Sequence, residues 1–404
     1  MHKLSFPEHW EMIPLENTVN IFDKHRIPLN EAHRQQMQGE YPYCGANGVV
    51  DYVNDYLFDG EYVLLAEDGG YWGPFENSAY LMNGKFWANN HAHVLQAKQG
   101  LSDNYFLMCQ LNYLDIKPFI SGTTRGKLNQ GMMKRVPLAL PPLPEQRAIA
   151  HILQTIQEAK STRQREIELE RERKAALMDY LFSHGTKGEP RKQTEIGEIP
   201  ESWEAVRLGN YCYKPDYGYT ESASESRVGP KFLRITDIQN DVVNWETVPY
   251  CVCTDETKEK YLLETGNIVI ARIGATTGKA YMIDNCPEAV FASYLIRVRT
   301  KGNLSPIFLA QYFGTNNYWR QIDQNKGGRL KGGVNIPILS HLVLPLPHLS
   351  EQQQIAEILQ ASDQKIAALE REVEHLNELF HAMLDELMTG QRSAVPLIDT
   401  ELVN

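Results

Sequence analysis

The chain has 404 residues and a formal net charge of −11, and 42% of its residues are hydrophobic. That length predicts two or three domains with enough apolar material for their cores. The sequence has no apolar run that suits a membrane span and no secretory signal at its start, so we expect a cytoplasmic protein. Its six cysteines form neither a CxxC pair nor a regular framework and are expected to be free thiols.

The first predicted domain covers residues 1–143. Segment 41–53 contains turn-forming glycines and an Asn-Gly pair, while segments 61–66 and 86–88 have the apolar and aromatic composition of strands. Short strands mixed with turns and a few helices are typical of an α+β domain with a twisted sheet.

Two pairs of side chains could be metal ligands. His91 and His93 would share one face of a strand, which suits a metal pair or a base-reading pair. Hydrogen-bonded structural positions are the commoner role of such residues, and we favour that interpretation. Cys251 and Cys253 lack a second pair of ligands, so the sequence gives little support for a metal there.

Residues 144–184 are predicted to form a first long helix, because they follow a proline-rich approach and contain no glycine and no proline after the first position. A polar linker at residues 185–199 is expected to act as a hinge. A second long helix is predicted at residues 349–391, and residues 392–404 form a short, loose tail.

The second predicted domain covers residues 200–348. Segments 231–238 and 267–274 are its strand candidates, and a helix is expected from Ile307 to Tyr318. We therefore predict a second mixed α+β domain of similar size to the first.

The segment from Arg272 to Ala280 resembles a phosphate-binding P-loop but lacks its spacing. Three residues rather than four separate Gly274 from Gly278, and Ala280 occupies the place of the Ser or Thr that would bind magnesium. A strand-end loop whose backbone and basic side chains meet phosphate is the better interpretation. No nuclease carboxylate set or methyltransferase motif is convincing, so the sequence predicts no active site.

Two internal repeats organise the chain. Residues 143–154 and 349–360 are identical at eight of twelve positions with an offset of 206, and segments 6–11 and 199–204 share Pro, Glu, Trp and Glu at an offset of 193. The chain is therefore two tandem units, each a domain followed by a helix. A duplication that keeps its frame and varies its domains suggests two reading heads of different specificity.

Apolar residues in the second helix recur at alternating steps of four and three, the pattern of a coiled-coil seam. The seam positions are Ile355, Leu359, Ser362, Ile366, Leu369, Val373, Leu376, Phe380, Met383 and Leu387. The equivalent positions of the first helix are apolar at both ends, at Ile149, Leu153, Ile156, Leu177 and Leu181, and mostly charged in the middle, where Lys160, Arg163, Glu170 and Lys174 flank Ile167. The second helix therefore needs a partner, and the first helix is a poor partner for itself.

The charges of the two helices favour pairing with each other. Residues 144–183 contain seven acids and seven bases, with the bases central, whereas residues 349–392 contain nine acids and three bases. Opposite charges meet if the helices pair antiparallel within one chain. The plainer alternative is that both charged stretches are solvated faces of ordinary helices.

A glycine-containing basic loop precedes each long helix, at residues 123–129 and 326–335, with Asn129 and Asn335 at equivalent positions. Glycines let the backbone approach phosphate closely, and arginine and lysine supply the charge. The alternative is a solvated loop. Because the feature recurs in both units, we favour a role in binding DNA.

These features resemble those of the specificity subunit of type I restriction-modification systems, over nearly the whole chain. A Pro-Glu-x-Trp element opens each domain, at Pro7–Trp10 and Pro200–Trp203, and a Glu-Gln pair begins each long helix, at residues 145–146 and 351–352. Segments 41–48, 234–237 and 272–274 also look like parts of that family's domains. Ser350 stands where the first repeat has Pro144, and both residues suit the start of a helix.

The resemblance implies two α+β target-recognition domains and two helices that pack as an antiparallel coiled coil. It implies a non-catalytic protein that reads a bipartite, asymmetric site in double-stranded DNA. Two methyltransferase (modification) subunits and a restriction/translocase subunit would be its partners. S-adenosylmethionine, ATP and magnesium are expected on those partners, and no cofactor is expected in this chain.

The expected dimensions agree with a divided site. Helices of about forty residues are roughly 60 Å long, and a domain of about 145 residues is roughly 40 Å across. The half-sites should therefore lie about one turn of DNA, roughly 34–36 Å, or slightly more apart.

Twelve residues are expected to lie on or near DNA. They are Tyr41, Tyr43, Asn47, Arg125 and Lys127 in the first domain, and Arg234, Asp237, Arg272, Lys279, Lys326, Arg329 and Lys331 in the second. Arginine and asparagine can bond bidentately to guanine and adenine, while lysine neutralises phosphate. The rival classes are a nuclease or methyltransferase that acts alone, and a coiled-coil adaptor without sequence preference.

Overall fold

A computed structural model of the protein describes residues 6–122, 126–239, 242–325 and 333–398. The chain divides into two compact units, which we call unit 1 (residues 1–165 and 370–404) and unit 2 (residues 166–369). Each unit combines one globular domain with a segment of both long helices. Across these described ranges, no helix has both the length and the apolar character to cross a membrane.

Unit 1 contains a six-stranded sheet, several short helices, the first part of one long helix and the last part of another. Its elements are β1 (Glu11–Pro14), α1 (Leu15–Thr18), β2 (Val19–Ile21), η1 (Asp23–His25), α2 (Glu31–Gln36), β3 (Gln38–Gly45), β4 (Gly48–Val53), β5 (Phe58–Ala66), β6 (Ala79–Ala88), β7 (Ala92–Ala97), α3 (Asn104–Tyr113), η2 (Lys117–Phe119), α4 (Gln130–Met133), β8 (Pro137–Leu140), and η4 (Val395–Leu397). The long helices α5 (Leu143–His184) and α11 (Leu349–Met388) each contribute to both units.

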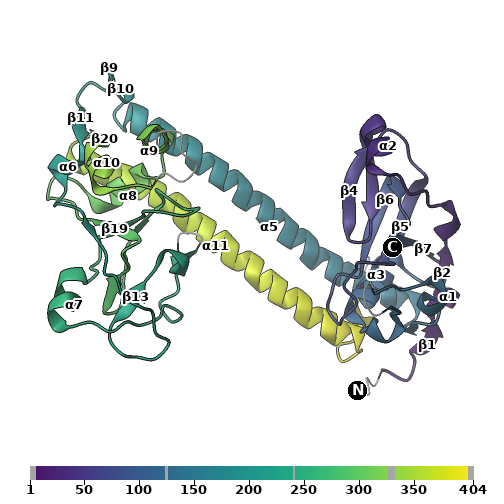
Figure 1. The fold of residues 1–404 in the computed structure, drawn as a ribbon. Helices are drawn as coiled ribbons and strands as arrows, with labels where there is room; N and C mark the ends of the chain where they lie inside the picture. The colour runs from purple at the N-terminus through teal and green to yellow at the C-terminus, as the bar shows by residue number, and fades with distance from the viewer. Residues whose placement is uncertain (1–5, 123–125, 240–241, 326–332, 399–404) are drawn as a thin grey trace. The chain divides into compact units, whose positions relative to one another are not determined.

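The strands of the unit 1 sheet are ordered β2-β7-β5-β6-β3-β4, and β3 runs parallel to β6 while the other neighbours are antiparallel. Helix α3 covers one face of this sheet, where Leu107 and Leu111 are buried with Val63 and Leu65 (Figure 1). The predicted strands in segments 61–66 and 86–88 are confirmed within β5 and β6. Segment 41–53 lies in the β3–β4 hairpin.

Unit 2 contains a smaller sheet. Its elements are β9 (Arg191–Thr194), β10 (Gly197–Pro200), β11 (Glu204–Arg207), α6 (Leu208–Tyr211), β12 (Asp216–Tyr217), β13 (Lys231–Leu233), η3 (Ile235–Asp237), β14 (Ile238–Gln239), β15 (Val242–Val243), α7 (Asp255–Tyr261), β16 (Ile268–Ala271), β17 (Ala280–Met282), β18 (Ala289–Phe291), β19 (Leu295–Val298), α8 (Pro306–Tyr312), α9 (Asn316–Asn325), α10 (Ile336–His341) and β20 (Val343–Leu346). Its four-stranded sheet has the order β12-β19-β16-β17.

Two predicted elements of unit 2 are shorter than expected. The strand predicted at residues 231–238 ends at Leu233, because the Asp237 carboxylate accepts a hydrogen bond from the Arg234 N–H (2.8 Å) and closes a 3₁₀ turn. The helix predicted from Ile307 to Tyr318 is interrupted between α8 and α9. There the Thr315 hydroxyl accepts a hydrogen bond from the Tyr318 N–H (3.2 Å) at the start of α9.

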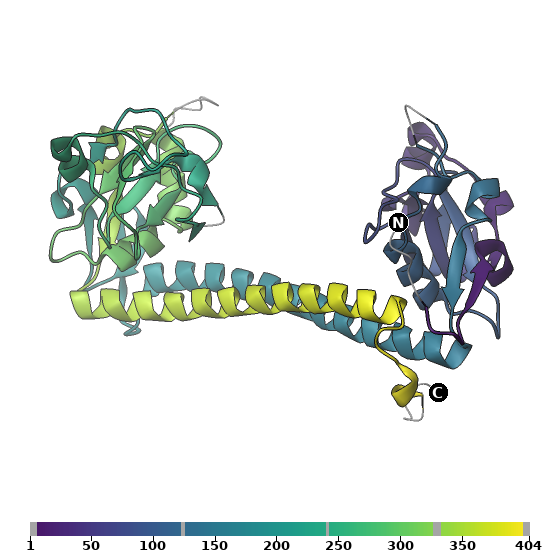
Figure 2. The ribbon, with the colours of Figure 1, turned by 90° about the horizontal axis from the view of Figure 1, so that it is seen from below.

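The two long helices pack against each other antiparallel within each unit (Figures 1 and 2). In unit 1, Ile149 and Leu153 of α5 share a buried cluster with Leu384 and Leu387 of α11. In unit 2 the other end of α5 meets the start of α11, as Leu181 is buried with Ile355 and Leu359. Both predicted long helices are thus confirmed, and α11 ends at Met388, three residues before the predicted boundary.

The charged middle of α5 faces α11 as the sequence predicts. In unit 1, Lys160 donates a hydrogen bond to Asn377 (2.8 Å) and Arg163 pairs with Glu372 (2.7 Å). In unit 2, Lys365 pairs with Glu170 (2.9 Å) and Lys174 with Asp363 (2.5 Å). The alternative of two unrelated solvated helices is therefore wrong.

A buried glutamine fastens each domain to its long helix, and the two arrangements are equivalent. In unit 1 the Gln146 side chain accepts a hydrogen bond from Asp103 N (3.0 Å) and donates to Leu101 O and Pro141 O (3.0 and 2.8 Å). In unit 2 the Gln352 side chain accepts from Ser305 N (2.8 Å) and donates to Asn303 O and Pro347 O (3.1 and 2.9 Å). We call these two sets of hydrogen bonds the amide joints.

A second equivalence links each Pro-Glu-x-Trp element to the end of a long helix. In unit 2, Gly185 follows α5 with a φ of 65° and lies against Pro200 and Trp203. In unit 1, Gly390 follows α11 with a φ of 70° and lies against Pro7 and Trp10. The positive φ and the close neighbours at both positions favour glycine.

The segments that follow the two long helices are more ordered than predicted. The linker predicted at residues 185–199 includes the β9–β10 hairpin, and Ile196 and Ile199 are buried in the core of unit 2. It is therefore not a loose hinge. The tail predicted to be loose beyond Gly390 also packs on unit 1, where Ala394 is buried and η4 forms.

Candidate nucleic-acid interface

The β3–β4 hairpin of unit 1 presents aromatic side chains at the edge of the sheet. Tyr52 and Tyr56 are exposed, and the ring of Tyr41 lies against that of Tyr56 with a centroid distance of 5.2 Å. The ammonium group of Lys85 lies 4.5 Å from the centroid of the Tyr56 ring. An exposed group of aromatic rings beside a cation is suited to contact with DNA, and Tyr41 stays a predicted contact.

Two other residues predicted in this hairpin have different roles. Tyr43 is only 2% exposed, and its hydroxyl accepts a hydrogen bond from Leu29 N (2.8 Å), so the prediction that it contacts DNA is wrong. The sequence does not distinguish Tyr43 from Tyr41, because both tyrosines precede the same turn. Asn47 is exposed at that turn, where its amide donates to Gly69 O (3.0 Å), and it remains available to a partner through its oxygen.

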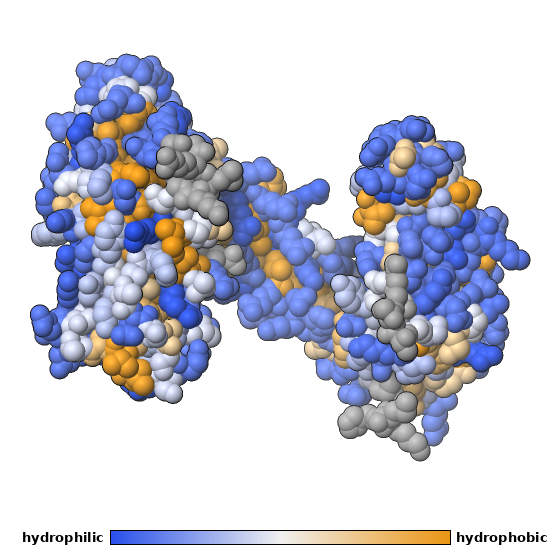
Figure 3. All heavy atoms as spheres, viewed as in Figure 1, coloured by the Kyte–Doolittle hydropathy of each residue, from blue (hydrophilic) through white to orange (hydrophobic). Residues whose placement is uncertain are grey.

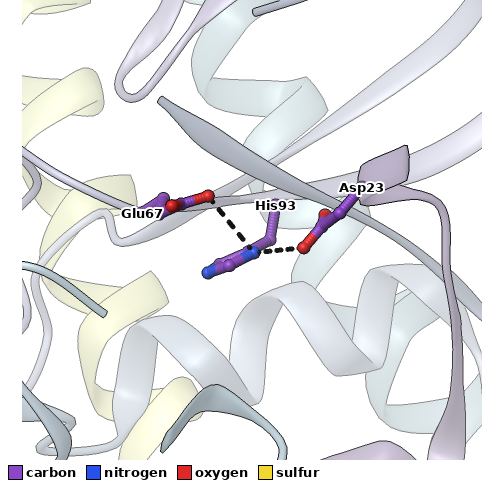
Figure 4. Close-up of side chains that lie close together, drawn as sticks. All are labelled: Asp23, Glu67 and His93. Atoms are coloured by element: carbon purple, nitrogen blue, oxygen red, sulfur yellow. Dashed lines mark hydrogen bonds and ion pairs between the residues drawn. The ribbon is translucent and has the colours of Figure 1, made fainter. Parts of the chain in front are cut away.

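The basic loop of unit 1 is attached to a buried cluster of charged residues (Figure 4). His93 is fully buried, with Nδ1 2.7 Å from Asp23 Oδ2 and Nε2 2.7 Å from Leu128 O. Lys127 pairs with Glu67 (2.9 Å). Arg125, the other residue predicted in this loop, lies outside the described residues. Both His93 nitrogens therefore lie within hydrogen-bond distance of an oxygen.

Asp23, Glu67 and His93 could together hold a metal ion by their spacing, since one ligand atom of each lies within 4.8 Å of the others. Arg26 already binds this group, because its Nη1 donates to Glu67 Oε2 (2.7 Å) and to Ala92 O (2.6 Å). An ion would have to displace Arg26 and Lys127. We interpret the cluster as an ion-pair network, which agrees with the structural role favoured for His93.

His91 does not share the face of His93. It precedes β7, is partly exposed, and places Nδ1 2.8 Å from Asp68 Oδ1. The second candidate ligand pair, Cys251 and Cys253, does not belong to a group of three or more possible ligands among the described residues. Burial raises the pKa of the Cys251 thiol to about 12.

The buried cluster predicts a pH dependence of stability. Burial opposes ionisation of Asp23 and Glu67, but interactions with His93 and Arg26 outweigh it and lower both pKa values, helped by Gln130 at Asp23 and by Lys127 at Glu67. A lowered pKa gives stability that is present above the unfolded value, about 3.9 for Asp and 4.3 for Glu, and is lost as the pH falls through the folded value. We expect unit 1 to lose stability progressively below about pH 4.

Urea unfolding of the full chain at pH 5 and pH 3 measures this effect. The Glu67→Gln variant should show a smaller difference between the two pH values, because it lacks one of the two carboxylates. An equal difference in the variant and the parent would exclude Glu67 as a source of the pH dependence.

In unit 2, Arg234 and Asp237 bind each other. The Arg234 guanidinium donates to both carboxylate oxygens of Asp237 (3.1 and 2.8 Å), and the Asp237 side chain is 9% exposed. The Asp237 side chain is therefore largely buried and engaged with Arg234, which leaves it little surface for a direct contact. Asp237 instead orients Arg234, whose side chain is 39% exposed and stays a predicted contact.

The loop between β16 and β17 carries the other predicted residues of unit 2. Arg272 lies over the ring of Tyr217 with its Cζ 4.6 Å from the centroid, and Lys279 is half-buried at the end of the loop. Gly274 and Gly278 have φ near 90°, which allows the tight turn. Lys326, Arg329 and Lys331 lie outside the described residues.

The equivalence of Asn129 and Asn335 is confirmed, and it has a structural reason. Asn129 caps α4, where its side chain accepts from Met132 N (3.0 Å), and Asn335 caps α10, where its side chain accepts from Ile338 N (3.0 Å). Each cap fixes the point at which a basic loop enters a short helix.

Exposed cations of unit 2 that the sequence did not reveal are Arg207, Lys214 and Lys301. They line one cleft, together with the exposed ring of Tyr213. Lys301 lies 87 positions after Lys214, so no spacing pattern connects the two lysines. A sequence signal for this cleft was the aromatic residue next to a base at Tyr213 and Lys214.

The comparison with known proteins decides the family. The sequence model of the type I restriction modification DNA specificity domain matches residues 7–171 and again residues 200–378. The chain belongs to the type I restriction-modification DNA specificity family. The two matched regions correspond to the two domains with their helices.

Relatives in this specificity family cover most or part of the chain. A type I restriction enzyme specificity subunit of Methanocaldococcus jannaschii is 25% identical, over 97% of this chain and 95% of that protein. A putative type I restriction enzyme specificity subunit of Haemophilus influenzae is 39% identical over 39% of this chain and 40% of that protein. The fold is similar to that of a crystal structure of the type I restriction-modification system S subunit from M. genitalium, with a TM-score of 0.61 and 14% identity, over 94% of this chain and 96% of that one.

Proposed function

We propose that this specificity-family chain reads a bipartite, asymmetric site in double-stranded DNA, one half with each domain. The observation that carries the proposal is the pair of equivalent amide joints, at Gln146 and Gln352, which attach two different sheets to one duplicated helical frame. A six-stranded sheet and a four-stranded sheet present different surfaces. Two domains with different surfaces, attached to duplicated helices in the same way, are suited to two different half-sites.

The paired helices are the proposed docking region for two methyltransferase subunits and a restriction/translocase subunit. Apolar side chains interrupt the hydrophilic surface of these helices (Figure 3). In unit 1 a groove of about 460 Å³ is lined by Ala159, Leu376 and Leu379 together with Arg163 and Glu372. Leu379 is 45% exposed, which favours contact with an apolar surface of a partner.

Catalysis is assigned to the partners in this proposal. They would bind S-adenosylmethionine for adenine methylation, and ATP with magnesium for restriction, in the cytoplasm. The charged groups of the cluster around Asp23 bind one another, and the proposal assigns them no catalytic role. The chain itself contributes recognition and assembly. The predicted DNA contacts are Tyr41, Asn47, Lys127, Arg234, Arg272 and Lys279 among the described residues, with Arg125 and the basic loop at 326–332 outside them.

Mapping of methylated adenines in the genome of a cell that carries the chain with its modification subunits tests the proposal. We expect one motif of two specific halves separated by unread bases. The double variant Tyr41→Ala/Asn47→Ala should relax one half only, since a lost base contact reduces discrimination by about 1–3 kcal/mol. A continuous motif, or methylation by the purified chain alone, would contradict the proposal and favour the rival enzyme class.

A chain that assembles with modification subunits and yet gives methylation without any motif would instead indicate a structural adaptor. The parent complex and the double variant are compared at equal expression. A change in one half of the methylated motif is then not confused with a change in the amount of assembled complex. The unaffected half serves as the internal control.

A further inference from the structure

Unit 2 contains a cleft of about 540 Å³ with a positive lining. Strand β11, helix α6, the chain before β12 and helix α10 form it, and α6 and α10 lie side by side (Figure 1). Arg207, Lys214 and Lys301 contribute permanent positive charges, and His341 adds an imidazole. Among the described residues that line the cleft, none is acidic. A concave cationic surface on a chain of net charge −11 requires an explanation.

The side chains of Arg207 and Lys214 are exposed, and neither forms an ion pair with a carboxylate in the described part of the chain. Lys301 is different, because its ammonium group donates to Asn210 O (3.1 Å). Lys98 makes the same kind of contact in unit 1, with Glu16 O (3.1 Å). Lys301 is therefore part of the duplicated frame, whereas Arg207 and Lys214 supply charge for which no protein partner is described.

The same surface continues along β12, an edge strand of the unit 2 sheet. Arg299 lies over the ring of Tyr213, with Cζ 5.8 Å from the centroid, at one end, and Arg272 lies over Tyr217 at 4.6 Å at the other. The two tyrosines are four positions apart in the sequence, so their Cα atoms are at most about 14 Å apart. That length corresponds to about four rises of 3.4 Å along one DNA strand.

A guanidinium that stacks on an aromatic ring keeps N–H groups available for a further acceptor. Two such stacks, together with the exposed cations Arg207 and Lys214 of the adjoining cleft, form an extended series of donors to an anion. A free phosphate would occupy only one position in this series. A phosphodiester backbone has the charge, the repeat and the length to occupy all of it.

We propose that this surface, consisting of Arg207, Lys214, Arg299 and Arg272 with their tyrosines, binds the phosphodiester backbone of DNA at the second domain. The inference rests on the proposed function and adds a positioning site to it. Backbone contacts fix the register of a protein on DNA without reading sequence. In unit 1 the positions equivalent to Arg207 and Lys214 by the repeat offset are Pro14 and Ile21, so the second domain would contribute more of the salt-dependent affinity.

The test compares the full chain, assembled with its modification subunits, with the double variant Arg207→Gln/Lys214→Gln. Affinity is measured at several salt concentrations for a duplex that carries the mapped motif and for a shuffled duplex of equal length. Each lost phosphate contact should reduce the slope of log K against log salt by about 0.9, so the double variant should lose about 1.8. Affinity at low salt should fall on the order of tenfold for both duplexes, leaving their ratio unchanged.

The matched control is Arg227→Gln/Lys260→Gln, which removes the same charge from exposed positions of unit 2 outside the cleft. It should retain the parental slope. If the cleft variant also retains the parental slope while the parent discriminates the two duplexes, the cleft proposal is overturned and the proposed function stands. A parent complex that shows no preference between the duplexes overturns both. Calorimetry with inorganic phosphate separates the two sources of ligand: phosphate binding lost in the variant with an unchanged DNA slope overturns the backbone assignment.

Discussion

Replacement of Gln352 by alanine is expected to destabilise unit 2 by about 3–5 kcal/mol. The Gln352 side chain is fully buried and satisfies three backbone groups, and each buried group left without a partner costs roughly 1–3 kcal/mol. The equivalent Gln146→Ala change should destabilise unit 1 by a similar amount, because its three hydrogen bonds have the same arrangement.

Urea unfolding of the full chain measures both changes, and amide hydrogen exchange locates them. Protection should be lost at Ser305 N in one variant and at Asp103 N in the other. Gln154→Ala is the matched control, since Gln154 belongs to the same repeat but is exposed and bonds only to Glu158, a contact of about 0.2–0.5 kcal/mol. If Gln352→Ala proves as stable as this control, the amide joint does not fasten the domain.

Replacement of Arg26 by alanine is the second change with a large expected effect, about 3–5 kcal/mol in unit 1. Arg26 bonds to Glu67 and Ala92 O, and its Nη2 lies 3.5 Å from Asp23 Oδ2. Without it, two largely buried carboxylates lose the guanidinium that binds both of them, and Lys127 is their remaining permanent cation among the described residues. An unbalanced buried charge is much more costly than the loss of a surface pair.

Chemical unfolding again provides the measurement. Arg26→Lys should be intermediate, because lysine keeps the charge but not the forked donor geometry. Arg392→Ala is the control: Arg392 also pairs with a glutamate of unit 1, Glu386, but both side chains are exposed, and such pairs contribute about 0–1 kcal/mol. If Arg26→Ala destabilises unit 1 by no more than that, water must replace the interactions that Arg26 makes with the two carboxylates.

The long helices were predictable because their signal is local and repeated. The seam from Ile355 to Leu387 fixed the face of α11, and the opposite charges of the two helices indicated the antiparallel pairing that Arg163–Glu372 and Lys365–Glu170 confirm. Such patterns survive in sequence because every few residues repeat the same information.

The role of the glutamines was not predictable, although the repeat marked both. Two of the three partners of each glutamine lie more than forty residues earlier, at Leu101 and Asp103 in unit 1 and at Asn303 and Ser305 in unit 2. Those loops have diverged in sequence, and backbone groups carry no residue-type signal. Only the folded chain shows that both glutamines bind the same backbone positions.

The solvent exposure of individual side chains was also not predictable from the amino-acid composition of a segment. Tyr41 and Tyr43 are two residues apart on β3, yet Tyr41 is half-buried against Tyr56 while Tyr43 bonds beneath the surface to Leu29. The linker was misjudged for a similar reason. Its polar composition concealed two apolar residues, Ile196 and Ile199, that are sufficient to bury one side of a hairpin.

The packing of Gly390 against Pro7 and Trp10 brings the end of α11 beside the segment that leads into the first domain. Phe6 and Ile398 both contact the same apolar cluster, so the first and last described residues end at one place in unit 1. The counterpart in unit 2, around Gly185 and Trp203, is bridged covalently by the β9–β10 hairpin. The fold would therefore tolerate an exchange of these connections, with the ends of the chain joined and the hairpin opened.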